Sequence, residues 1–127
     1  MGKIVRLVIG EKTVILNFNM IFGEQIAKLL KITDPQPEFI LKAILELNEK
    51  SSFLMYKVII YCGILGNDYI KGLDASMTQE DVAELILKCN GEQLTEVFET
   101  LAKELGFDLN ATVEESKKNE KKRNNIR

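Results

Sequence analysis

The stretch from Phe53 to Gly66, FLMYKVIIYCGILG, is the most apolar in the chain and limits what the rest can build. It carries one charge, Lys57, and its apolar side chains fall on all faces of a helix rather than along one stripe. At about 1.5 Å per residue such a helix is roughly 21 Å long, which is too short for a bilayer. A helix that is apolar nearly all round is one that other elements surround. The stretch therefore predicts the buried central helix of a small domain.

A β-hairpin is expected ahead of this helix, over Lys3–Phe18. Apolar and polar residues alternate on both sides of a turn that contains Gly10, which is the pattern of two antiparallel strands. A lone hairpin is marginal in water, so one of its faces must lie on the helices. The outer face, with Ile4, Val8 and Ile15, is more apolar than exposure to solvent requires. It therefore indicates a second partner for the hairpin.

Four further helices are expected from apolar residues at helical spacing. They cover Ile21–Ile32, the residues from Pro35 to about Lys50, the residues between Thr78 and Gly91, and Glu92–Leu105. Asp34 is expected to be the N-cap of the second of these helices and Thr78 that of the third, which also has acidic residues in its first turn. Ser51 and Ser52 can cap the central helix, and Gly66 and Gly91 are expected to end helices. The last two helices are expected to form an antiparallel pair, because so few residues join them.

The predicted fold class is α+β and mostly α-helical: an N-terminal β-hairpin followed by a bundle of about five helices. Length and a hydrophobic content of 46% suit one domain, which we place at residues 1–109. Residues 110–127 have no aromatic and few apolar side chains, so we expect a charged flexible tail there. Residues 114–127 carry six basic and three acidic side chains, which leaves the rest of the chain at about −5.

The usual residues of catalytic and metal sites are missing from the sequence. There is no histidine, which removes the commonest general base and metal ligand. Cys62 and Cys89 lie in apolar helical patterns and are interpreted as buried reduced thiols, with a disulfide or a reactive pair as the alternative. No catalytic residue, cofactor or metal is therefore predicted.

A basic run near the C-terminus is the other candidate for binding, besides the hairpin face. It consists of Lys117, Lys118, Lys121, Lys122 and Arg123. These side chains could contact phosphate or an acidic protein surface through charge, although no aromatic residue is interleaved for base stacking. The alternative is that the run only keeps the chain soluble or serves as a linker.

The order of these elements resembles that of the tail assembly chaperones of long-tailed bacteriophages. The resemblance covers most of residues 1–106 and rests on three features. The hairpin Lys3–Phe18 precedes a helical domain, an aromatic-containing helix over Leu54–Gly66 ends in small residues, and a loop leads to Met77–Leu87 (MTQEDVAELIL), where Thr and acids open an amphipathic helix.

This resemblance implies a function without catalysis, in a phage or prophage. Such a chaperone binds the long tape-measure protein, keeps it soluble and helps recruit tail-tube subunits. It works in the host bacterial cytoplasm and is not expected in the mature virion. We further expect a homo-oligomer, or a mixture of monomer and oligomer, formed through the outer hairpin face and the edges of the helix pair over 80–105.

The alternative function is a small regulatory module that contacts nucleic acid through the basic C-terminal tail. The acidic body and the lack of a recognisable recognition helix argue against it. Nothing in the sequence points to a membrane partner.

Deleting residues 112–127 should leave the melting temperature nearly unchanged, because a flexible tail contributes no packing. A scanning calorimetry or circular dichroism melt of the shortened chain checks this expectation. A fall of more than about 5 °C, on the order of 1 kcal/mol for a domain of this size, would show instead that the tail packs on the body.

Overall fold

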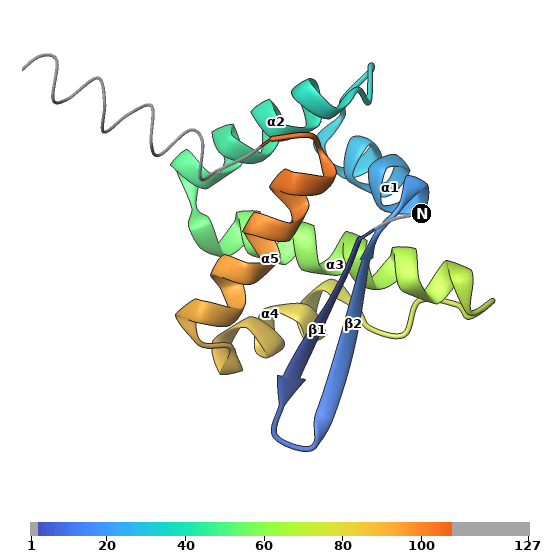
Figure 1. Ribbon diagram of the computed structural model, residues 1–127, viewed down its shortest axis with the longest axis vertical. Helices are drawn as coiled ribbons and strands as arrows, with labels where there is room; N and C mark the ends of the chain where they lie inside the picture. The colour runs from blue at the N-terminus through green and yellow to red at the C-terminus, as the bar shows by residue number, and fades with distance from the viewer. Residues whose placement is uncertain (1–2, 108–127) are drawn as a thin grey trace, which may run out of the picture.

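The computed structural model describes residues 3–107, and it confirms the predicted fold class: a hairpin followed by five helices. The elements are β1 (Lys3–Ile9), β2 (Lys12–Phe18), α1 (Met20–Leu30), α2 (Pro37–Lys50), α3 (Ser52–Ile70), α4 (Gln79–Lys88) and α5 (Gly91–Glu104). Figure 1 shows α3 crossing the middle of the domain, with the hairpin in front of it. The tail expected at 110–127 lies outside the described residues.

The hairpin has the predicted strands and a two-residue turn. Ile9 pairs with Lys12 across Gly10 and Glu11, and the antiparallel register continues to Lys3 and Phe18. Gly10 has φ +62°, a left-handed conformation that glycine adopts without strain at the first position of such a turn. One face of the hairpin belongs to the core through Val5, Leu7, Val14, Leu16 and Phe18.

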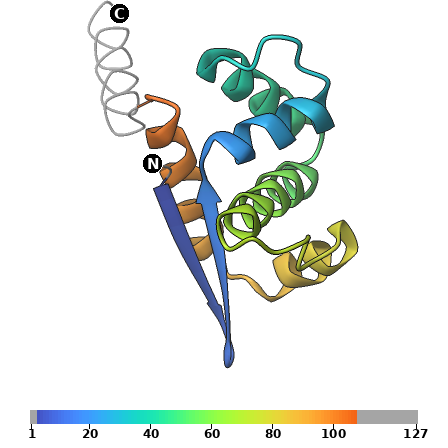
Figure 2. The ribbon, with the colours of Figure 1, turned by 90° about the vertical axis from the view of Figure 1, so that its right-hand side faces the viewer.

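Helix α3 is the central buried helix, as the sequence predicts. It packs against β2, α1, α2 and α4, and Figure 2 shows it seen almost end-on, with the hairpin and α5 on one side and the other three helices on the other. Ile59 and Ile60 are fully buried in its middle. The helix has 19 residues, but among residues 3–107 no helix is long and apolar enough to cross a membrane.

The expectation that α3 ends at Gly66 is wrong, since the helix continues to Ile70. Gly63 and Gly66 are instead the points where α3 passes closest to β2. A Cβ atom on Gly63 would lie 3.0 Å from Cβ of Leu16, and one on Gly66 would overlap the carbonyl oxygen of Asn17. The small residues therefore serve the contact between helix and strand rather than the end of the helix.

Most of the predicted caps are present, with two shifts. The hydroxyl of Ser51 accepts a hydrogen bond from the Leu54 amide (3.2 Å), and Thr78 forms a reciprocal capping box with Asp81. However, α2 begins at Pro37 after Gln36, not at Pro35 after Asp34. Gly91 does not end a helix either, because Asn90 caps α5 and Gly91 is its first residue.

Helices α4 and α5 do not form the expected antiparallel pair. Helix α4 packs on α3, whereas α5 packs on β1, and the two share few contacts. The reason lies in their connection, since both Cys89 (φ −77°, ψ 146°) and Asn90 (φ −90°, ψ 171°) are extended. Two extended residues carry the chain away from α4, so α5 runs beside the hairpin (Figure 1).

Replacing Gly66 with alanine should destabilise the domain by about 1–3 kcal/mol, because the added methyl group has no room beside β2. Gly23→Ala is the matched control. Gly23 also lies inside a helix but has open space around it, so alanine there should stabilise by about 0.5–1 kcal/mol. Urea unfolding of both variants measures the two changes. Equal effects of the two substitutions would contradict the close contact.

Candidate protein-binding surface

The outer face of the hairpin is the clearest exposed apolar surface that the strands form. We use the name outer hairpin face for the residues on the side away from the core: Ile4, Arg6, Val8, Thr13 and Ile15. The side chains of Ile4 and Val8 are 47% and 58% exposed, and Ile15 is half-buried. In the register Ile15 pairs with Arg6, so it lies diagonally between Ile4 and Val8. The structure therefore brings the three predicted apolar residues into one patch.

The two edges of the hairpin differ in how their backbone groups are used. In a two-residue hairpin the residues beside the turn form a hydrogen-bonded pair, and such pairs alternate along the ladder. The backbone groups of Val8 on β1, and of Thr13 and Ile15 on β2, therefore point away from the partner strand. The carbonyl of Val8 accepts a hydrogen bond of 2.9 Å from Nε2 of Gln93 in α5. On the β1 side, the edge is thus partly occupied by the protein itself.

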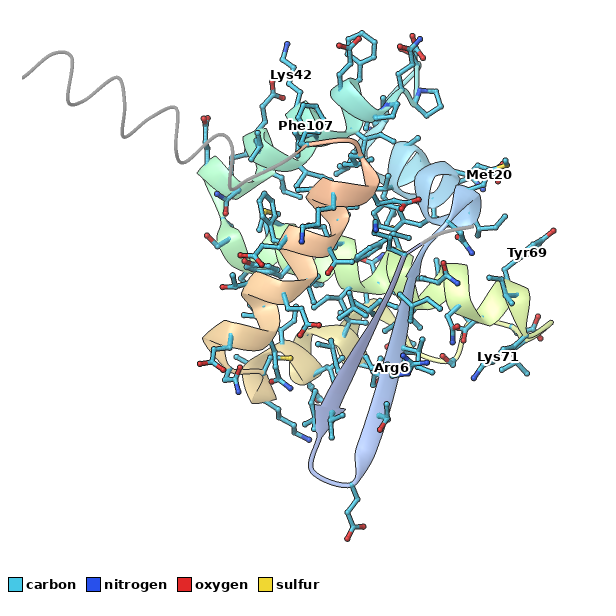
Figure 3. All side chains as sticks on the ribbon, in the orientation of Figure 1. Arg6, Met20, Lys42, Tyr69, Lys71 and Phe107 are labelled. Carbon is cyan, nitrogen blue, oxygen red and sulfur yellow. The ribbon has the colours of Figure 1, made fainter. Side chains whose placement is uncertain are left out.

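The edge of β2 borders a groove, which we call the β2 groove. Its volume is about 360 Å³, and it lies between Lys12–Ile15 of β2, the C-terminal half of α3 and the loop 71–77. Apolar side chains on its wall include Ile64 and Met77, and its basic residues are Lys12 and Lys71. In the view of Figure 3, Arg6 of the outer hairpin face and Lys71 lie on the same side of β2.

A buried carboxylate fixes the far wall of this groove. Asp68 is only 5% exposed, and its Oδ2 accepts hydrogen bonds from the backbone amide (2.8 Å) and the hydroxyl (2.9 Å) of Ser76. The carbonyl of Asp68 also accepts a hydrogen bond from the Leu73 amide. The loop 71–77 is therefore held against the end of α3, with Met77 half-buried under it.

Sequence reasoning missed Asp68, Ser76 and Gln93. A signal for Asp68 was present, because an acidic residue in the last turn of a helix faces the negative end of the helix dipole and needs a donor. Ser76, eight residues further on, could not be identified as that donor without the path of the loop. Gln93 could not be connected with Val8 from sequence at all, since 85 residues separate them.

The two cysteines are both free thiols in different environments. Burial raises the pKa of Cys62 to about 12, and partial burial also raises the pKa of Cys89. Cys62 is buried as expected, whereas Cys89 is only half-buried. Within residues 3–107, no three side chains of His, Cys, Asp or Glu are grouped so that they could hold a metal ion.

The other predicted binding residues lie elsewhere. Lys117, Lys118, Lys121, Lys122 and Arg123 are outside the described residues. The edges of a helix pair over 80–105 cannot act as one surface, because α4 and α5 pack on different elements. The outer hairpin face and the adjoining β2 groove remain as the candidate surface.

Comparisons of the chain with models of known protein families, with curated proteins and with solved structures found no match.

Replacing Asp68 with alanine should free the loop 71–77, because hydrogen bonds to a charged group contribute about 1.5–3 kcal/mol. Amide exchange at Ser76, whose N–H is bonded to Asp68, should become faster, and urea unfolding should show a loss of stability. Asp74→Ala is the control, since Asp74 is an exposed residue of the same loop and its change should stay within about 0.5 kcal/mol. Unchanged exchange at Ser76 in the Asp68 variant would show that the carboxylate does not hold the loop.

Proposed function

We propose that this chain is a non-enzymatic assembly chaperone that binds a polypeptide partner through the outer hairpin face. The partner that we propose is the tape-measure protein of a phage or prophage, with recruitment of tail-tube subunits as the further step. The proposal takes its partner from the resemblance in the order of elements. The observation that carries the binding role is the exposure of Ile4 and Val8 on a sheet whose opposite face is core.

The exposed face is unusual for a strand pair. Two-stranded sheets are stable only when a face packs on something, and here the inner face supplies that need completely. The exposed side chains of Ile4 and Val8 on the outer face do not belong to this core. An apolar patch on a strand surface is also an aggregation hazard, so its presence favours a binding role.

The shape of the patch suits a chaperone that must release its client. Three aliphatic side chains form a small area, and small interfaces are typical of weak and reversible association. Because the contact is mainly apolar, moderate salt should not release the complex. The same face can pair with a second copy of the chain when the client is missing, which is consistent with the proposed homo-oligomer.

Co-expression with the tape-measure protein of the same genome should raise the soluble yield of that protein, and Ile4→Thr with Val8→Thr should remove the effect. Threonine keeps strand propensity but replaces apolar groups with hydroxyls, so affinity for the client should fall by about tenfold or more. The double variant should melt close to the wild-type temperature, because both side chains are exposed. Soluble yield and pull-down of the client are the measurements.

The matched control is Leu87→Gln, which removes an apolar side chain that is 78% exposed on α4 and is not part of the outer hairpin face. It should behave as wild type. A strictly monomeric protein that leaves the client's solubility unchanged and binds DNA in a salt-sensitive way would contradict the chaperone proposal and support the regulatory alternative.

A further inference from the structure

We infer that the edge of β2 in the β2 groove accepts an extended segment of a partner protein as a third strand, and that this segment carries alternating apolar and acidic side chains. This inference rests on the proposed function, because it specifies how the client is held. It adds a backbone contact to the apolar contact of the outer hairpin face.

The first argument is the state of the backbone at Thr13 and Ile15. Both residues direct their N–H and C=O groups away from β1, as the register and the two-residue turn require. Among residues 3–107, no hydrogen bond from outside the hairpin reaches either of these backbone groups. Two residues further along, the carbonyl of Asn17 faces Gly66 of α3, so the edge is closed there.

The second argument is the contrast with β1. The corresponding edge of β1 is partly closed by the side chain of Gln93, which donates to the carbonyl of Val8. Proteins usually blunt a sheet edge in this way, because free edge groups invite pairing with another chain. The open groups of β2 lie beside a groove rather than under a covering side chain, so they are positioned for strand addition.

The third argument concerns the side chains of the added strand. Successive residues of a third strand would point alternately to the outer hairpin face and into the β2 groove. On the outer side they would meet Ile15 of β2, and in the groove they would meet the basic side chains of Lys12 and Lys71 beside Ile64 and Met77. Of the described residues that line the groove, only Asp68 is acidic, and its carboxylate is already bonded to Ser76. Charge complementarity therefore favours acidic side chains between apolar ones.

The experiment measures binding of two fluorescently labelled hexapeptides, one of alternating glutamate and valine and one of alternating lysine and valine, by anisotropy with the full chain. We expect the glutamate peptide to bind at least about tenfold more tightly than the lysine peptide. Lys71→Glu should reverse part of this preference. Absence of binding, or equal binding of the two peptides, would overturn the inference.

The backbone contact is tested by Ile15→Pro against Ile15→Ala. Proline removes the outward N–H of residue 15 without removing a hydrogen bond between the strands, and alanine shortens the side chain but keeps the N–H. Both variants lose the apolar contact of the Ile15 side chain, and proline also loses the N–H, so binding of the glutamate peptide should be weaker by about a further tenfold with proline than with alanine. Equal losses in the two variants would overturn strand addition, because the side chain alone would then be responsible.

A second measurement covers the case in which Ile15→Pro does not fold. Two glutamate peptides, one with N-methylated valines and one with N-methylated glutamates, each lack one of the two alternating sets of N–H groups. Because one of these sets faces β2, binding to the wild-type protein should weaken to a similar extent for one of the two peptides, and unchanged binding of both would contradict the inference. Sedimentation shows whether a second copy of the chain occupies the edge instead. In that case the wild type and Ile15→Ala would be dimers, Ile15→Pro would be a monomer, and no peptide would bind, which would overturn the inference of a partner segment.

These outcomes separate the inference from the proposed function. If the client stays soluble with wild type and with Ile15→Pro but not with the outer-face double variant, the chaperone role stands and strand addition fails. If the wild-type protein itself does not raise the solubility of the client, both the chaperone role and strand addition fail.

Discussion

The close contact between α3 and β2 is the constraint on which the rest of the structure depends. At Gly63 and Gly66 the helix has no side chain, so the strand can lie directly against it. The side-chain Nδ2 of Asn19 donates a hydrogen bond to the carbonyl of Gly66 (3.0 Å). Its Oδ1 accepts a hydrogen bond from the backbone amide of Phe22 and so caps the start of α1. One asparagine therefore joins the hairpin, α1 and the central helix.

This contact has a cost at the same place. Asn17 is buried, and its Oδ1 has no hydrogen-bond partner among residues 3–107. An unpaired buried acceptor costs about 1–3 kcal/mol, which the apolar contacts of Leu16 and Phe18 on either side must offset. These contacts can offset the unpaired acceptor because Leu16 and Phe18 are almost fully buried, and burying such large apolar side chains is favourable. The strand is thus held firmly at its end, where it meets α3, while the part nearer the turn borders the open groove.

Local patterns in the sequence predict much of this fold, and the failures share one cause. Strand alternation places Ile4, Val8 and Ile15 on the outer face, and the all-round apolar helix predicts the burial of Ile59. The sequence misplaces the end of α3 at Gly66 because glycine can either stop a helix or allow a close approach, and only the neighbouring strand distinguishes the two. Gly91 marks the right place in the chain but begins α5 after the Asn90 cap, instead of ending α4. The direction of α5 and the Asp68–Ser76 contact likewise depend on elements distant in sequence or on the path of a loop.

The candidate surface follows from a difference between the two faces of the hairpin: one packs in the core and the other is exposed. The inner face is fixed by the core, so its residues cannot change without loss of stability. The outer hairpin face is carried on the same strands, yet its exposed side chains, Ile4 and Val8, do not belong to the core. A binding surface on such a support loses little conformational entropy when a partner binds, because the backbone is already ordered. A small contact area on this support can therefore give useful affinity. The exposed residues of the outer hairpin face can also vary in sequence while the fold stays the same.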